Sequence, residues 1–324
     1  MSEDNDKNME IIKESNYRET MQNEAVPFIE SVRNDGFFEG FDGIKLHYVS
    51  YTCENPVKTV VILHGFTESA EKYREMIYYF LKAGFNVFLY EQRCHGKSER
   101  LVDDKTLTHV DRFEDYVKDF EIFTERIVPK TLPLVLYSHS MGGAVSALYL
   151  QKHPKVFGKA VFSSPMIAPT TGGFPKFVSQ AVCKTAIVFG KSKKRLFIAG
   201  EYPGKEEFDT SCGTSFERFS FYEELKRSNP DYQNFSPSYR WTSEALNVTK
   251  KILKKGEPEK IEIPALLFSA GLDIMVKLPE QRLFADRMKN CELITYDTAK
   301  HEIFFSTDDV MEDYVNKVTD FFSR

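Results

Sequence analysis

The chain has 324 residues, 42% of them hydrophobic, which is enough for one large α/β domain with a sizeable core. Its formal net charge of -5 argues against a general nucleic-acid surface. The five cysteines form no CxxC pair, so we expect neither a disulfide framework nor a zinc site, and we predict a reducing compartment, the cytoplasm. The polar, acidic start is unlike a signal peptide, and no apolar run is long enough to span a bilayer.

Residues 1–25 are polar, and we predict that they form a flexible segment. A hairpin is then expected over 36–52, with its turn at Asp42-Gly43. Strands are predicted at 58–63, 86–90, 132–137, 159–163, 264–269 and 291–296, and helices up to 82 and at 111–128, 144–153, 279–289 and 309–322. This alternation predicts an α/β fold, with a mostly parallel sheet and helices on both of its faces.

The alternation is interrupted between residues 166 and 255. The stretch 176–260 has 16 Lys and Arg against 11 Asp and Glu, a local excess of +5 in an acidic chain, and it holds the only tryptophan, Trp241. We therefore expect an α/β core formed by 26–165 and 256–324, and an inserted helical lid formed by 166–255.

Apolar residues recur from Phe177 to Phe189 in this insert, and four of the five residues at 191–195 are basic. An apolar face beside a basic cluster suits an acyl chain with an anionic head group, or a transient contact with a membrane surface. The alternative left open is that the apolar face docks on the core and the basic run is a solvated turn.

The motif that carries chemistry is Ser138-His139-Ser140-Met141-Gly142-Gly143. It lies between a predicted strand and a predicted helix, and a serine at the tip of such a turn is typical of a nucleophile elbow. The strained turn requires small neighbours, which Gly142 and Ser138 supply. An ordinary strand-to-helix turn would be the plain alternative, so the rest of the chain must decide.

A serine nucleophile needs a base, and the base needs a group that orients it. Asp273 follows the strand at 264–269, and His301 follows the strand at 291–296. The order Ser140, Asp273, His301 is the chain order expected for an α/β-hydrolase. Asp297 competes for the role of the acid, and His64 is the alternative base, although we assign His64 to loop structure.

Two backbone N–H groups are the predicted oxyanion donors. One belongs to Met141, the residue after the nucleophile, and the other belongs to Phe66, in the loop that follows the strand at 58–63. The remaining histidines have no partners at metal-ligand spacing, so we expect neither a metal nor another cofactor.

A resemblance then becomes specific. The segments that carry it are 62–66 (ILHGF), 91–98 (EQRCHGKS), 138–143, 271–273 (GLD), 300–302 (KHE) and, in the insert, 212–219 (CGTSFERF), 229–231 (NPD) and 237–241 (PSYRW). Together they resemble the serine hydrolases that include lysophospholipase L2 and monoacylglycerol lipase. The resemblance covers roughly 36–324 and implies an α/β-hydrolase core with a helical lid, no metal cofactor and lipid-like ester substrates. Ser138, Cys94 and Ser306 depart from the family pattern.

We therefore predict a serine carboxylic-ester hydrolase with Ser140 as nucleophile, His301 as base and Asp273 as orienting acid. Lysophospholipids are the first expected substrate class, and monoacylglycerols or other esters are the second. A peptidase of the same fold would need an acidic anchor for an amine, which the basic insert disfavours. A catalytically silent lipid-binding protein is the third alternative, and the intact Ser, Asp and His set argues against it.

Overall fold

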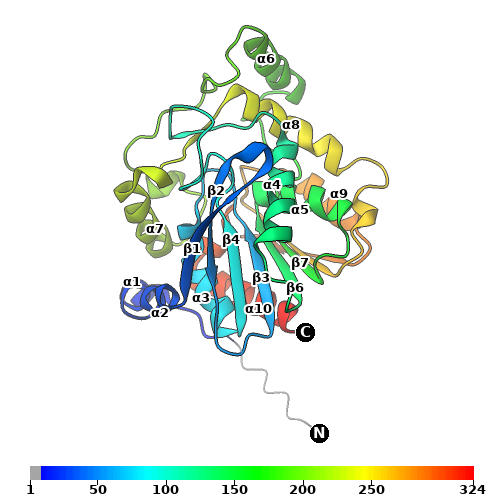
Figure 1. Cartoon of the computed structure of the whole chain (residues 1–324). Helices are drawn as coiled ribbons and strands as arrows, with labels where there is room; N and C mark the ends of the chain where they lie inside the picture. Colours follow the sequence, from blue (N-terminus) through cyan, green and yellow to red (C-terminus); the bar gives the residue numbers. More distant parts are fainter. Residues whose placement is uncertain (1–8) are drawn as a thin grey trace.

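The computed structural model describes residues 9–324, and its centre is an eight-stranded sheet (Figure 1). The strand order is β1-β2-β4-β3-β6-β7-β9-β10. The bounds are β1 Arg33–Glu39, β2 Lys45–Tyr51, β3 Lys58–Leu63, β4 Phe85–Tyr90, β6 Leu134–His139, β7 Lys159–Ser163, β9 Ala265–Ala270 and β10 Cys291–Tyr296. The pairs β1–β2 and β2–β4 are antiparallel and the others are parallel, so the predicted mostly parallel sheet is confirmed.

Helices cover both faces of this sheet. The helices α4 (Phe113–Arg126), α5 (Met141–Lys152) and α9 (Leu278–Arg287) share a hydrophobic cluster on one face. The helices α3 (Arg74–Lys82) and α10 (Asp308–Ser323) share a second cluster on the other face. The central strands β3 and β6 are almost wholly buried, which is why they read as continuous apolar runs rather than as alternating ones.

The prediction that residues 1–25 are flexible is wrong for residues 9–25; residues 1–8 lie outside the described part of the chain. The chain is helical from Glu14 to Ser31, through the helices α1 (Tyr17–Thr20) and α2 (Val26–Ser31). Its buried stripe consists of Tyr17, Met21, Ala25 and Ile29, spaced four residues apart. This spacing places the four side chains on one helix face, and the surrounding polar residues masked it in the composition.

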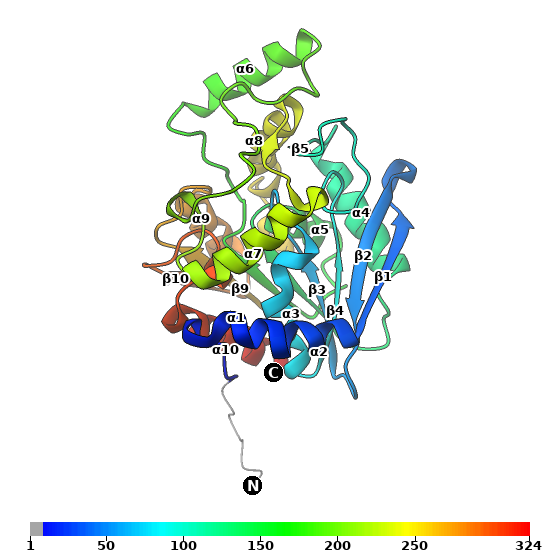
Figure 2. The same ribbon diagram turned by 90° about the vertical axis from the view of Figure 1, so that its left-hand side faces the viewer.

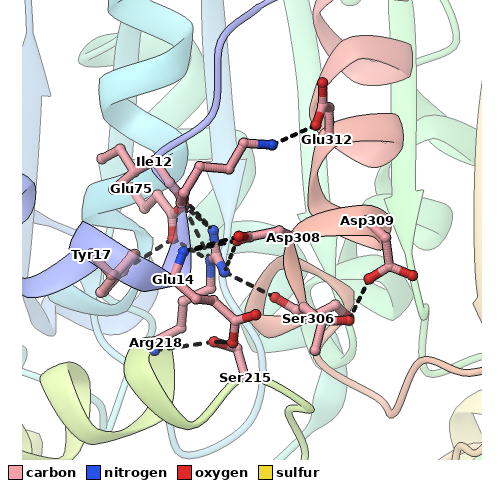
Figure 3. A network of polar contacts seen from close by, with 12 residues as sticks. Ile12, Glu14, Tyr17, Glu75, Ser215, Arg218, Ser306, Asp308, Asp309 and Glu312 are labelled. Carbon is pink, nitrogen blue, oxygen red and sulfur yellow. Dashed lines mark hydrogen bonds and ion pairs between the residues drawn. The ribbon is translucent and has the colours of Figure 1, made fainter.

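A buried arginine ties this N-terminal segment to the rest of the molecule (Figure 3). The Arg218 guanidinium, which is fully buried, donates to both carboxylate oxygens of Glu75 at 3.1 Å and to the carbonyl oxygen of Ile12 at 2.7 Å. It also donates to the carbonyl oxygen of Ser306 at 3.1 Å. A buried charge is tolerated only with such partners. Since these partners lie in different segments, Arg218 links the insert to the N-terminus and to the segment after β10.

The inserted segment contains three helices: α6 (Lys176–Val188), α7 (Phe216–Ser228) and α8 (Tyr239–Ile252). The inner side of α8, including Trp241 and Val248, belongs to the core cluster shared with α4 and α5. Arg218 anchors α7, as described above. In Figures 1 and 2, α6 lies at the top of the molecule, away from the sheet. The insert is therefore attached firmly through α7 and α8, and α6 is its most exposed helix.

Candidate active site

Ser140 lies at the tip of the turn between β6 and α5, with the unusual backbone angles φ 49° and ψ -116°. Its N–H donates to the carbonyl oxygen of Ser163 on the neighbouring strand at 3.1 Å. A side chain on Gly142 would place its Cβ 2.2 Å from the carbonyl oxygen of Leu63, so only glycine fits there. The elbow thus combines a positive φ at Ser140 with a close approach of the backbone at Gly142 to β3.

The structure brings Ser140, His301 and Asp273 together. The hydroxyl of Ser140 lies 2.8 Å from Nε2 of His301, and Nδ1 of His301 lies 2.7 Å from Oδ2 of Asp273. Since a carboxylate can only accept, Nδ1–H donates to Asp273 and Nε2 is free to accept the hydroxyl proton. The second oxygen of Asp273 accepts the N–H groups of Met275 and Val276 at 2.8 and 3.1 Å, which fixes its orientation.

The environment keeps Asp273 ionised. Burial by itself raises the pKa of this carboxyl group, but the hydrogen bond and the charge of His301, together with the two backbone donors, outweigh burial and lower it. A negative Asp273 can therefore hold the imidazole in one orientation and stabilise its protonated form.

The two alternatives from the sequence lie elsewhere. Asp297 is exposed, and its backbone packs against Gly271. His64 is fully buried, with Nδ1 bonded to the carbonyl oxygen of Gly65 at 2.7 Å and Nε2 accepting the N–H of Gln92 at 2.9 Å. The geometry thus places Asp273 rather than Asp297 on His301, and it uses both ring nitrogens of His64 within the loop.

The predicted oxyanion donors belong to the first residue of α5 and to a residue of the loop after β3. The N–H of Met141 is at the first turn of α5, where helix N–H groups have no partner within the helix. Phe66 follows Gly65 in the loop after β3, and its ring lines the cavity that opens on Ser140. Within residues 9–324, neither N–H has an intramolecular acceptor, so both are available to a negative oxygen.

A cavity of about 440 Å³ opens on Ser140. Its lining is mostly apolar and includes Phe66, Val178, Val182, Trp241, Leu246 and Met275. None of the residues that line it carries a charge. The size and character of this cavity match those of small-molecule sites that bury an apolar ligand.

The single apolar face expected from Phe177 to Phe189 is wrong. Val178 and Val182 line the cavity, but Phe177 and Phe189 are 76% and 75% exposed. The reason is helical geometry, because α6 has the cavity on one side and solvent on the other, and apolar residues occupy both sides.

Sequence reasoning missed most of the cavity lining. Trp241 and Leu246 come from α8, and Met275 comes from the loop that also carries Asp273. The only available signal was the position of the single tryptophan in the insert.

The departure from the family pattern at Cys94 has a structural meaning. This residue has φ 65°, a conformation that favours glycine, and its Sγ accepts the N–H of Leu101 at 3.2 Å.

In this site a serine on a strand–turn–helix elbow is hydrogen-bonded to a histidine, which is in turn hydrogen-bonded to an aspartate, and both partners lie in loops that follow later strands of a mostly parallel sheet. This arrangement defines a serine hydrolase of the α/β-hydrolase fold. The family model described as "Serine aminopeptidase, S33" matches residues 54–308. The chain belongs to this family, and the family and fold predicted from the sequence are confirmed.

The relatives agree with this assignment. Lysophospholipase L2 of Escherichia coli (strain K12) is 28% identical over 311 residues, covering 90% of this chain and 88% of that protein. The monoacylglycerol lipase of Mycolicibacterium smegmatis is 28% identical over 156 residues, covering 47% and 54%. A crystal structure of a soluble variant of Saccharomyces cerevisiae monoglyceride lipase superposes with a TM-score of 0.69 at 20% identity, covering 90% and 96%, and this shows the shared fold.

Two features are absent within residues 9–324. No group of three or more His, Cys, Asp or Glu side chains is arranged so that it could hold a metal ion. None of the helices in this range combines the length and the apolar character that crossing a bilayer requires.

Proposed function

We propose that this protein hydrolyses carboxylic esters of lipids, with lysophospholipids as its first substrate class and monoacylglycerols as the second. Ser140 attacks the ester carbonyl while His301 takes its proton, and Asp273 supports the imidazolium that forms. The N–H groups of Phe66 and Met141 stabilise the negative oxygen. His301 then donates the proton to the leaving alcohol, and water releases the acid from the acyl-enzyme.

The observation that carries this proposal is the uncharged, apolar cavity that opens on Ser140. An acyl chain would gain free energy on entering such a cavity because its methylene groups leave water. Lysophospholipase L2 of E. coli, which matches nearly the whole chain, carries a name that fits the same chemistry.

The alternatives receive less support. A peptidase that cuts after an N-terminal residue would need an anion for the substrate amine, and the lining of the cavity offers none. A catalytically silent lipid-binding protein would have no need for the hydrogen-bonded arrangement of Ser140, His301 and Asp273. A panel of lysophospholipid, monoacylglycerol and aminoacyl amide substrates discriminates among the three.

The cavity predicts a dependence on acyl length. Each methylene buried in it contributes up to about 0.8 kcal/mol, so kcat/KM should rise up to about fourfold per methylene until the cavity is full. Val182→Asp should lower the ratio of kcat/KM for octanoyl and acetyl esters by about tenfold or more, because it places a charge in the lining. The measurement is this ratio in the parent and the variant.

Phe189→Asp is the matched control, since Phe189 lies just past the end of the same helix without lining the cavity. It should leave the ratio unchanged. Equal ratios in Val182→Asp and the parent, at unchanged melting temperature, would remove α6 from the acyl site.

We also propose that the outer surface of α6 contacts an anionic membrane. From Ser164 to Gly200 the chain has six basic residues and no acidic one. The exposed apolar side chains of this surface are Phe177 and Val188 on α6, and Phe174, Phe189, Phe197 and Ile198 in the segments that flank the helix. Phe197 and Ile198 also line the cavity, so this surface adjoins it. Apolar groups at the interface and cations beside anionic lipids are the two forces that bind peripheral proteins.

The thiols bear on which membrane this would be. All five cysteines are free, which suits a reducing compartment, so we propose that the protein works in the cytoplasm and meets the inner face of its membrane.

Vesicle binding tests the membrane contact. Vesicles of phosphatidylglycerol should bind the parent more tightly than vesicles of phosphatidylcholine, and salt should weaken the binding. Joint Phe177→Ser and Phe189→Ser replacement should weaken it by about tenfold or more, because two exposed rings no longer enter the interface. Phe37→Ser, an exposed phenylalanine on β1, is the control and should bind like the parent. Lack of parent binding to anionic vesicles would contradict the proposal.

A further inference from the structure

Three charged side chains form a buried bridge beside the candidate active site. The ammonium group of Lys72 lies 3.2 Å from Oε1 of Glu68 and 2.5 Å from Oε1 of Glu302. The side chains of all three are largely buried, with relative exposures of 9%, 3% and 14%. Lys72 also lies over the rings of Tyr222 and Phe305, each 5.3 Å from the ring centre. The ammonium group of Lys72 therefore lies between two carboxylates and near two aromatic rings.

One end of the bridge holds the loop that carries the Phe66 oxyanion donor. Oε2 of Glu68 accepts the N–H of Gly65 at 2.5 Å and the hydroxyl of Tyr73 at 2.6 Å. A Cβ on Gly65 would lie 2.8 Å from that oxygen and 3.0 Å from the ring of His139. Glycine therefore lets the backbone before Phe66 pack directly between the carboxylate and the residue that precedes Ser140.

The other end of the bridge holds the loop that carries His301. Glu302 is the next residue along the chain, and its N–H donates to the carbonyl oxygen of Cys212 at 2.8 Å. His139 completes the connection, because its ring lies 4.8 Å from that of His301 and its Nε2 lies 3.7 Å from Oε1 of Glu68. The bridge therefore spans the oxyanion loop, the elbow and the histidine loop.

We propose that Glu68, Lys72 and Glu302 are positioning residues that hold the oxyanion loop and the His301 loop in register with Ser140. This inference rests on the proposed function, since it assigns roles around that reaction. The bridge leaves one net negative charge near His301, so it also favours the imidazolium that forms during acylation.

The charges around His301 come from several elements. The ionisable groups near it, directly or through one neighbour, are Asp273 after β9, His139 at the end of β6, Glu302 beside it in the chain, Glu68 and Lys72 after β3, and Cys212 in the insert. Lys300, the preceding residue, donates to the carbonyl oxygen of Ser211 at 3.1 Å. Burial lowers the pKa of His139 to about 3 despite the opposing charge of Glu68, so His139 is neutral. Burial raises the pKa of the Cys212 thiol to about 12, so that group is neutral as well.

The test uses two substitutions that remove charges of opposite sign. Glu302→Gln removes a negative charge near His301, so the acid limb of the kcat/KM profile for an acetyl ester should move to lower pH by about half a unit or more. Lys72→Met removes a positive charge, so the limb should move to higher pH by a similar amount. In both variants kcat should fall about tenfold with little change in KM, because His301 and the oxyanion donors are still present but are held less precisely.

Asp297→Asn is the control, because Asp297 is an exposed carboxylate four residues before His301, where water screens its charge. Its acid limb should stay in place. Shifts in the same direction, or none in folded variants, would overturn the proposal, because a purely structural bridge would lower the melting temperature without opposite pH shifts. If Lys72→Met does not fold, the comparison of Glu302→Gln with Asp297→Asn decides.

Failure of the proposed function gives a different pattern. The parent would then be inactive on every ester, whereas failure of the bridge leaves the parent active. If the parent is inactive on every ester, the pH dependence of fluorophosphonate labelling at Ser140 replaces turnover as the readout, since labelling needs only the nucleophile and its base.

Discussion

Ser140→Ala should abolish ester hydrolysis and fluorophosphonate labelling together, while the protein remains folded. The expected loss in turnover is on the order of a million-fold, as for other triads whose members act as a unit. The physical reason is that the hydroxyl of Ser140 is the group that His301 contacts at 2.8 Å, and the variant offers no replacement oxygen. The measurements are turnover of a soluble ester, labelling detected on a gel, and a thermal melt.

Alanine is a mild change at this position, because serine already carries a Cβ at the strained φ of 49° and the substitution adds no further backbone strain. The melting temperature should therefore stay close to that of the parent, since alanine bears the same Cβ in the same turn. Persistent labelling of the variant would mean that another serine is the nucleophile.

The second large effect separates the two acids. Asp273→Asn should reduce kcat by roughly ten-thousand-fold, as removal of the orienting acid does in other triads. The asparagine side chain would offer an N–H or a neutral oxygen to Nδ1 of His301, so the imidazole would lose both its fixed orientation and the charge that stabilises the imidazolium. Steady-state kinetics on an acetyl ester measures the loss.

Asp297→Asn serves as the comparison in the same assay. Asp297 is exposed and does not contact His301, so its replacement should change kcat less than about threefold. A larger loss at Asp297 than at Asp273 would assign the third role of the triad to Asp297.

Much of this site could be predicted from local patterns. The elbow around Ser140 is a local motif, because a strand, a small-residue turn and a helix follow one another within a few residues. The positions of Asp273 and His301 could be predicted because the carboxyl ends of neighbouring parallel strands meet at one edge of the sheet. Local patterns do not separate Asp273 from Asp297, since both follow strands, and the 2.7 Å contact between Asp273 and His301 distinguishes them.

The errors share one cause. The flexible N-terminus was inferred from its polar composition, but Tyr17 and Met21 pack against the core, and Arg218, two hundred residues away in sequence, binds the carbonyl group of Ile12. The apolar face of α6 was inferred from spacing, but spacing does not indicate on which side the cavity lies. Both errors concern contacts between segments that are distant in the chain.

The order of the core strands and helices, the family and the residues of the elbow therefore follow from local sequence alone, because they depend on periodicity and on motifs of a few residues. Three other features depend on the folded chain: which carboxylate contacts His301, which residues of α6 line the cavity, and the bridge of Glu68, Lys72 and Glu302. These contacts join residues that are far apart in the chain, and the free energy of a buried charge or an apolar side chain depends on the partners that folding brings to it.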